Sequence, residues 1–137
     1  MEAHYRFTDE AFEKQFKYCL LHPSYFTHEA HLRLAWIHLY KYGLQQAIKN
    51  VTHQLEEFTS SHGERTKYNT TVTVAAVRAV YHFMLDSESQ TFKDFIEEVP
   101  RLKFDFKELL GYHYAFNIFD SDEAKEKYME PDLLPFD

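Results

Sequence analysis

Two histidines, His28 and His31, lie three residues apart just after Thr27 and are the strongest candidates for chemistry in this sequence. A threonine before an apolar run is a typical helix N-cap, so both imidazoles are expected on the first turn of a helix. An imidazole there can donate or accept a proton near neutral pH, and it can bind a divalent metal. The sequence therefore predicts His28 and His31 as catalytic acid–base groups or as metal ligands.

Spacing alone leaves the metal hypothesis incomplete. A catalytic zinc ion usually needs three protein ligands, and the HExxH signature is absent because His31 follows His28 by three residues rather than four. His38, His82 and His113 could each provide a third ligand, although no spacing selects one of them. The alternative is that His28 hydrogen-bonds a loop and that His31 is a partly buried structural residue.

The segment that must position these histidines, residues 28–42, has the pattern of a central helix. Thr27 can cap its first turn, and Gly43 suits the left-handed conformation that often follows a helix. Apolar residues occupy most of its circumference, which indicates a helix covered by its neighbours. Trp36 is expected in the core, and Arg33, next to the histidine face, could bind an anionic ligand or form an ion pair.

Three further long segments have apolar residues at helical spacing, and they are predicted as helices near 9–21, 44–58 and 70–85. The last begins with β-branched residues, which also occur in strands. Asn69 is a good cap, however, and the apolar positions that follow repeat every three or four residues. A helix is therefore the prediction for this segment.

The first of these helices is expected to bury a stripe that includes Cys19 and Leu20. Cys19 is the single cysteine of the chain, so it cannot form an internal disulfide. A lone thiol of this kind suits a reducing compartment, which favours the cytoplasm.

Shorter elements are expected after residue 85. Helices are predicted at 91–99 and 105–116, the second capped by Asp105, and Ser121 or Asp122 begins a short charged turn. Prolines prevent regular structure in the last residues. This tail still carries Leu133, Leu134 and Phe136, so it is expected to pack against the body of the protein.

The composition supports the same fold class. The chain has 137 residues with 45% hydrophobic and 18% aromatic content, which suits a packed core. Only 3 glycines and 4 prolines are available for hairpin turns, which favours helices. The prediction is an all-α, single-domain helical bundle over residues 1–137, with about four main helices, shorter C-terminal helices and an extended packed tail.

The charge and the hydropathy pattern exclude two classes of partner. A net charge of −7 argues against nucleic-acid binding, because phosphate contacts need clustered Lys and Arg. No apolar run approaches the roughly 20 residues of a membrane span, and the N-terminus lacks the apolar core of a signal peptide. We therefore expect a soluble, cytoplasmic protein with no nucleic-acid or membrane partner.

Short connections between consecutive helices favour antiparallel neighbours, which would bring the starts of helices 28–42 and 70–85 to the same end of the bundle. That arrangement gathers five residues: His28, His31, Tyr68, Asn69 and Thr70. Tyr68, Asn69 and the adjacent Thr71 are the predicted ligand-binding residues there. Free backbone N–H groups at two helix starts favour a small anion. The sequence thus predicts a pocket for a small anionic molecule, and it leaves open whether the pocket is enzymatic and whether it holds a metal.

Three stretches, FTHEAHLRLAW, KYNTTVT and EAKEKYMEPDLLPF, together resemble a family of small all-helical bacterial proteins. The resemblance extends over nearly the whole chain and includes His28, His31, Trp36, Tyr68, Thr71, Pro131, Asp132 and Leu133. The chain departs from the family at Asn69 and Thr70, where the resemblance leads one to expect histidine and glutamate. No reaction is established for the family, so the resemblance implies a helical fold and no particular activity.

A second class of function is a non-catalytic helical interaction module, such as a homodimer, in which the histidines are structural. The many aromatic residues would then form an interface. A concave pocket with converging polar groups would favour ligand binding, whereas a large exposed apolar patch would favour the interaction module.

Overall fold

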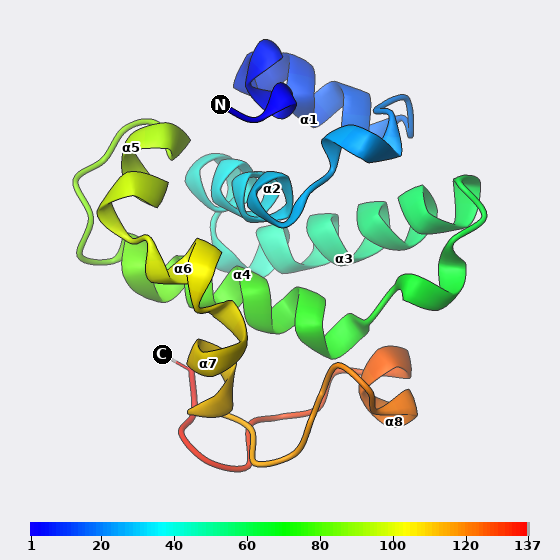
Figure 1. The fold of residues 1–137 in the computed structure, drawn as a ribbon, viewed down its shortest axis with the longest axis vertical. Helices are drawn as coiled ribbons and strands as arrows, with labels where there is room; N and C mark the ends of the chain where they lie inside the picture. Colours follow the sequence, from blue (N-terminus) through cyan, green and yellow to red (C-terminus); the bar gives the residue numbers. More distant parts are fainter. Residues whose placement is uncertain (137) are drawn as a thin grey trace. The chain divides into compact units, whose positions relative to one another are not determined.

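The computed structural model describes residues 1–136, and all regular structure within them is helical, which confirms the predicted all-α class (Figure 1). The α-helices are α1 (Asp9–Lys17), α2 (His28–Tyr42), α3 (Leu44–Ser61), α4 (Thr70–Met84), α5 (Phe92–Glu98), α6 (Arg101–Phe104), α7 (Phe106–Gly111) and α8 (Asp122–Glu126). Three short 3₁₀ turns are η1 (Ala3–Arg6), η2 (Pro23–Tyr25) and η3 (Arg65–Lys67). Asp137, the last residue of the predicted tail, lies outside the described residues.

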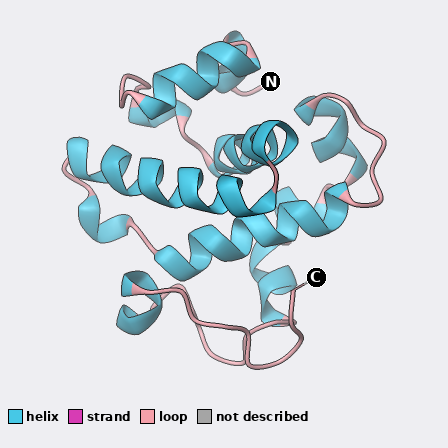
Figure 2. Ribbon diagram, turned by 180° about the vertical axis from the view of Figure 1, so that it is seen from behind, coloured by secondary structure: helices cyan, strands magenta, loops and turns pink. Residues whose placement is uncertain are grey.

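The chain divides into two compact units, Met1–Tyr68 and a second that begins at Asn69. The first contains α1 to α3, and the second contains α4 to α8. Both consist of helices joined by loops (Figure 2).

Helix α2 is the most deeply buried element of the first unit and spans the residues that the sequence predicts. Every residue from Leu32 to Leu39 is buried. The Thr27 hydroxyl accepts a hydrogen bond from the amide of Ala30 at 3.2 Å, which confirms the predicted cap. Apolar side chains on most of its circumference produce this burial, because no face remains polar enough to meet solvent.

Helix α3 follows α2 after a single residue, Gly43, whose φ of 81° is favourable only for glycine. Helix α3 continues to Ser61, three residues beyond its predicted end at 58, and buries one apolar stripe. Helix α2 is strongly foreshortened in Figure 1 whereas α3 lies across the view, so the two helices cross steeply. The expectation that consecutive helices alternate in direction therefore fails at this joint, where one residue makes the whole turn.

Helix α1 is shorter than the predicted 9–21. It ends at Lys17, and Cys19 then adopts the left-handed conformation with φ of 59°. The amide of Leu20 returns to the carbonyl of Gln15 at 2.8 Å, which closes the helix end. Leu20 is 67% exposed as a result, so the predicted buried stripe is wrong at this residue.

Helix α4, the first element of the second unit, confirms the helical interpretation of the β-branched segment. Asn69 caps it as predicted, because its Oδ1 accepts a hydrogen bond from the amide of Val72 at 3.0 Å. Its apolar side chains are buried from Val74 through Val77. Burial has outweighed the modest helix propensity of valine and threonine.

The shorter helices begin close to the predicted positions. Thr91 caps α5 and Ser121 caps α8, both through their hydroxyls. Asp105, by contrast, makes no side-chain cap bond, and α7 ends at Gly111 rather than near residue 116. Helix α6 was not predicted, because four residues are too few to show a helical period.

The C-terminal tail is extended, as predicted, and is held by its backbone. The amides of Leu133 and Leu134 donate to the carbonyls of His113 and Tyr112 at 3.0 and 3.3 Å. The two leucine side chains are 52% and 60% exposed. Main-chain hydrogen bonds, rather than burial of these leucines, therefore fix the tail.

Trp36 is 3% exposed, so truncating it should leave a large cavity in the core. We expect Trp36→Ala to lower the free energy of unfolding by about 3–5 kcal/mol, measured by urea denaturation followed by circular dichroism. Tyr18→Ala is the control, because Tyr18 is 62% exposed and should change stability little. An unchanged denaturation midpoint for Trp36→Ala would contradict the core assignment.

Cys19 carries a side chain where a left-handed backbone favours glycine. We expect Cys19→Gly to raise the free energy of unfolding by about 1 kcal/mol, because glycine has no Cβ to clash in this conformation. Cys19→Ala keeps the Cβ and removes only the thiol, so it should give no such gain. Equal stabilisation by both substitutions would show that the thiol, not the backbone, is responsible.

Candidate functional site

His28 and His31 lie on the first turn of α2, as the sequence predicts. His28 is exposed, whereas the ring of His31 lies against Phe26 with the centroids 5.5 Å apart. The Nε2 atom of His31 is buried and has no hydrogen-bond partner. Burial, with a smaller contribution from His28, lowers the pKa of His31 to about 4. His31 is therefore neutral at pH 7 and a weak general base.

His31 belongs to a cluster of rings in the first unit. Phe16 contacts Phe26 and Phe58 with centroid distances of 4.7 and 4.6 Å, and Phe58 also contacts His62 at 4.5 Å. The Nε2 atom of His62 is buried without a partner as well. Imidazoles packed among phenylalanine rings indicate a packing role rather than proton transfer, which supports the structural alternative for His31.

The first unit also contains a buried polar cluster, which is formed by residues at the start of the chain and on α2. The Nε2 atom of His4 is 3.1 Å from a carboxylate oxygen of Glu29 and 3.3 Å from one of Glu2. On the other side of the ring, Nη1 of Arg33 is 3.3 Å from Nδ1 of His4. These three potential metal ligands, one imidazole and two carboxylates, lie within 4.8 Å of one another.

The tautomer of His4 decides what this cluster can hold. A guanidinium group can only donate, so Nδ1 must accept from Arg33 and the imidazole proton must be on Nε2. A metal at Nε2 would require that proton on Nδ1, where it would face the arginine N–H. Burial also lowers the pKa of His4, which favours the neutral ring. The cluster therefore fits a hydrogen-bonded network and not a metal centre.

The metal prediction for His28 and His31 finds no support either. Over residues 1–136, the residues gathered closely enough to share an ion do not include this pair. A third ligand beside the two imidazoles is what a catalytic zinc site would need.

Arg33 has no donor left for a ligand. Its Nε and Nη2 donate to Asp9 at 3.2 and 2.9 Å, and Nη2 also donates to the carbonyl of Phe7 at 2.8 Å. Its Nη1 donates to the carbonyl of His4 at 2.7 Å and to the imidazole described above. These contacts use all five N–H groups of a guanidinium. The predicted ligand-binding role is therefore not supported, and Arg33 instead holds residues 4–9 against α2.

Asn69 and Thr71, also predicted to bind a ligand, use their polar atoms within the second unit. The Asn69 amide, besides capping α4, donates to the carbonyl of Ile118 at 2.9 Å. The Thr71 hydroxyl donates to the carbonyl of Lys127 at 2.9 Å and accepts from the amide of Met129 at 3.0 Å. Both residues join the start of α4 to distant segments, which is a structural task.

Tyr68 ends the first unit and is 5% exposed. The Arg65 guanidinium lies 5.3 Å from the centre of its ring, in a cation–π contact. Tyr68 belongs to the same unit as His28 and His31, whereas Asn69 and Thr71 belong to the second unit. A pocket common to these residues stays a prediction.

The second unit contains a cavity of about 420 Å³ that the sequence did not predict. The end of α4, the two short helices α6 and α7 and the tail all contribute to it. Its aromatic and basic lining residues are His82, Phe83, Arg101, Tyr112, His113 and Phe136. None of the described lining residues is acidic, although the chain as a whole has a net charge of −7.

His113 has a fixed orientation in this cavity. Its Nδ1 lies 2.7 Å from the carbonyl of Leu134, and its ring stacks on Phe136 with a centroid distance of 4.1 Å. A carbonyl oxygen only accepts, so Nδ1 carries the proton of the neutral ring. The sequence predicts His113 only as a potential third metal ligand. No local pattern reveals its neighbours in the structure, because they belong to the tail.

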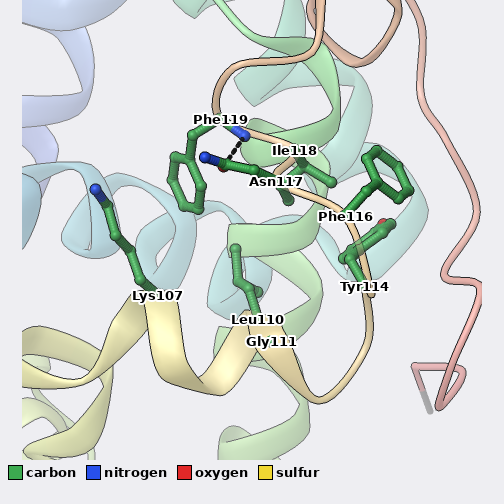
Figure 3. A pocket seen from close by; sticks show the side chains of 8 residues that line it. All are labelled: Lys107, Leu110, Gly111, Tyr114, Phe116, Asn117, Ile118 and Phe119. Carbon is green, nitrogen blue, oxygen red and sulfur yellow. Dashed lines mark hydrogen bonds between the residues drawn. The ribbon is translucent and has the colours of Figure 1, made fainter.

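A smaller hollow of about 260 Å³ shares Leu110 as a wall with the first (Figure 3). Its polar residues engage one another or a neighbouring ring. The amide of Phe119 donates to Asn117 at 3.0 Å, and Nζ of Lys107 lies 5.1 Å from the Phe119 ring centre. The larger cavity, with its basic groups, is the better candidate for a ligand site.

Comparisons with protein families, with curated proteins and with solved structures find no match for this chain. The resemblance to the bacterial helical family stays a prediction. No helix within residues 1–136 is both long enough and apolar enough to cross a bilayer. The structure therefore shows an all-α protein, and the candidate site is argued from the geometry of its residues alone.

Acid should destabilise the fold through His31, whose Nε2 atom is buried, and through the buried His38. Burial lowers the pKa of His31 and of His38 from 6.5 to about 4. Between these two pH values, each histidine is protonated in the unfolded chain and neutral in the folded protein. Stability should fall as the pH drops through this window, by up to ~1.4 kcal/mol per pH unit for each histidine. Urea denaturation between pH 4 and 7 measures this slope.

The His31→Gln substitution removes one of the two histidines responsible for the dependence of the free energy of unfolding on pH. The slope of that dependence should therefore be smaller in this variant. The control His53→Gln removes a histidine whose side chain is 70% exposed, and it should leave the slope unchanged. Equal slopes in the wild-type protein and His31→Gln would contradict a His31 that stays neutral in the folded state.

Arg33→Lys should lower the free energy of unfolding by about 2 kcal/mol or more. Lysine has three donors in place of five, so a buried carbonyl or imidazole near residues 4–9 loses its partner. Thermal denaturation measures the loss, with the exposed Arg6→Lys as the control. A stability equal to that of the control would mean that the network is dispensable.

Proposed function

We propose that the cavity of the second unit binds a small anionic molecule with an aromatic or apolar body. The observation that carries the proposal is the presence of Arg101 and His113 among aromatic rings in one cavity of about 420 Å³. Ligand pockets typically measure roughly 300–1,000 Å³ and combine apolar walls with a few polar groups, so both size and lining suit this role.

The charge of the ligand follows from the basic lining. A guanidinium presents a planar set of donors that matches a carboxylate, and Arg101 is such a group at the cavity. The rings of Phe83, Tyr112 and Phe136 would contact the body of the ligand. The proposal keeps the ligand class expected from the sequence and assigns it to a different place, at the end of α4 rather than at its start.

The interaction module and the homodimer stay predictions. Large exposed apolar side chains occur in both units, including Leu20 in the first and Phe104, 73% exposed, in the second. Such residues are common on monomeric proteins and by themselves do not define an interface. A cytoplasmic location likewise remains an inference from the single cysteine.

Benzoate is a suitable first probe, because its ring fits aromatic walls and its carboxylate fits Arg101. We expect isothermal titration calorimetry to detect benzoate binding to the wild-type protein. Arg101→Gln should weaken that binding about 10-fold or more, since a hydrogen bond to a charged group contributes about 1.5–3 kcal/mol.

Arg6→Gln is the matched control, because Arg6 is an exposed arginine that does not line the cavity. Benzyl alcohol, which lacks the carboxylate, should bind the wild-type protein and Arg101→Gln equally. Equal loss of benzoate affinity in both arginine variants would indicate a general effect of net charge and would contradict the proposed site.

A further inference from the structure

The hydrogen-bonding state of His113 specifies a second feature of the ligand, and this inference rests on the proposed function. The Nδ1 proton is committed to the carbonyl of Leu134 at 2.7 Å. In the neutral ring, Nε2 therefore carries a lone pair and can only accept. This atom is not among the buried polar atoms that lack partners, and it has no partner among the described residues. It is therefore accessible for a hydrogen bond from outside the chain.

Two contacts keep His113 in this state. The tail amide of Leu133 donates to the His113 carbonyl at 3.0 Å, and Phe136 stacks on the imidazole with an interplanar angle of 21°. Rotation of the ring out of its plane would break the stacking on Phe136, and a flip within the plane would break the hydrogen bond to Leu134. The lone pair of Nε2 consequently has a fixed direction. A group held in this way favours ligands that place a donor at one position.

Arg101 and His113 have opposite requirements. The guanidinium of Arg101 only donates and prefers an anionic oxygen, whereas Nε2 of His113 needs a donor. We infer that the ligand carries both an anionic group and a hydroxyl or N–H donor on an apolar body, as in the aromatic hydroxy acids. A ligand without the donor would cover the lone pair of His113 and leave it unpaired, which costs free energy.

The test compares benzoate with 2-, 3- and 4-hydroxybenzoate by isothermal titration calorimetry at pH 8. At least one hydroxybenzoate should bind the wild-type protein about three- to tenfold more tightly than benzoate, as one additional neutral hydrogen bond predicts.

Two substitutions separate the two nitrogens of His113. In His113→Asn, the side-chain amide can still donate to the Leu134 carbonyl, but no acceptor replaces Nε2, so the preference for the hydroxyl should disappear. In His113→Gln, the longer amide can place an acceptor near the Nε2 position, so part of the preference should return. Circular dichroism and the affinity for benzoate itself show whether each variant keeps its fold and its cavity.

Each outcome has a distinct meaning. Benzoate binding without any gain from a hydroxyl group overturns this inference alone. A hydroxyl preference that persists unchanged in His113→Asn overturns it as well, because another residue must then accept the hydrogen bond. Absence of binding by all four compounds overturns both this inference and the proposed function.

Discussion

The first unit depends on satisfying one buried charge, the guanidinium of Arg33. Arginine keeps its charge at any pH at which the protein folds, so its five donors need partners once it is 4% exposed. The carbonyls of His4 and Phe7, the carboxylate of Asp9, which accepts twice, and Nδ1 of His4 supply them. The same contacts hold the start of the chain against α2 and determine the tautomer of His4, which places the imidazole proton toward Glu29.

The second unit is held by polar side chains that bind the backbone of distant segments. Asn69 holds the segment at Ile118, and Thr71 holds the segment from Lys127 to Met129. From there the tail continues to residues 133 and 134, which pair with residues 112 and 113. That pairing brings the Leu134 carbonyl to His113 and thereby shapes the cavity. The candidate site is thus a consequence of the same contacts that fold the tail.

The sequence predicted the long helices well, because their signals are local. Helix α2 has the expected bounds, and Asn69 caps α4 as its residue type suggests. The prediction for α1 failed because a left-handed cysteine ended the helix where glycine would have been the recognisable signal. The cavity could not be predicted from local patterns, since its histidine and the carbonyl that orients it are separated by 21 positions in the chain.

Three of the predicted site residues share one property. Polar groups near helix starts, such as those of Arg33, Asn69 and Thr71, suit ligands, yet the same groups are what a helical chain needs to cap helices and to satisfy buried backbone. A polar residue is available to a ligand only where the fold leaves one of its donors or acceptors unused. In the described part of this chain, Nε2 of His113 at the cavity of the second unit is unused and is not buried, whereas the unpartnered Nε2 atoms of His31 and His62 are buried. That unused acceptor lines the same cavity as Arg101, which is why we propose the ligand site at the end of α4 and not at its capped start.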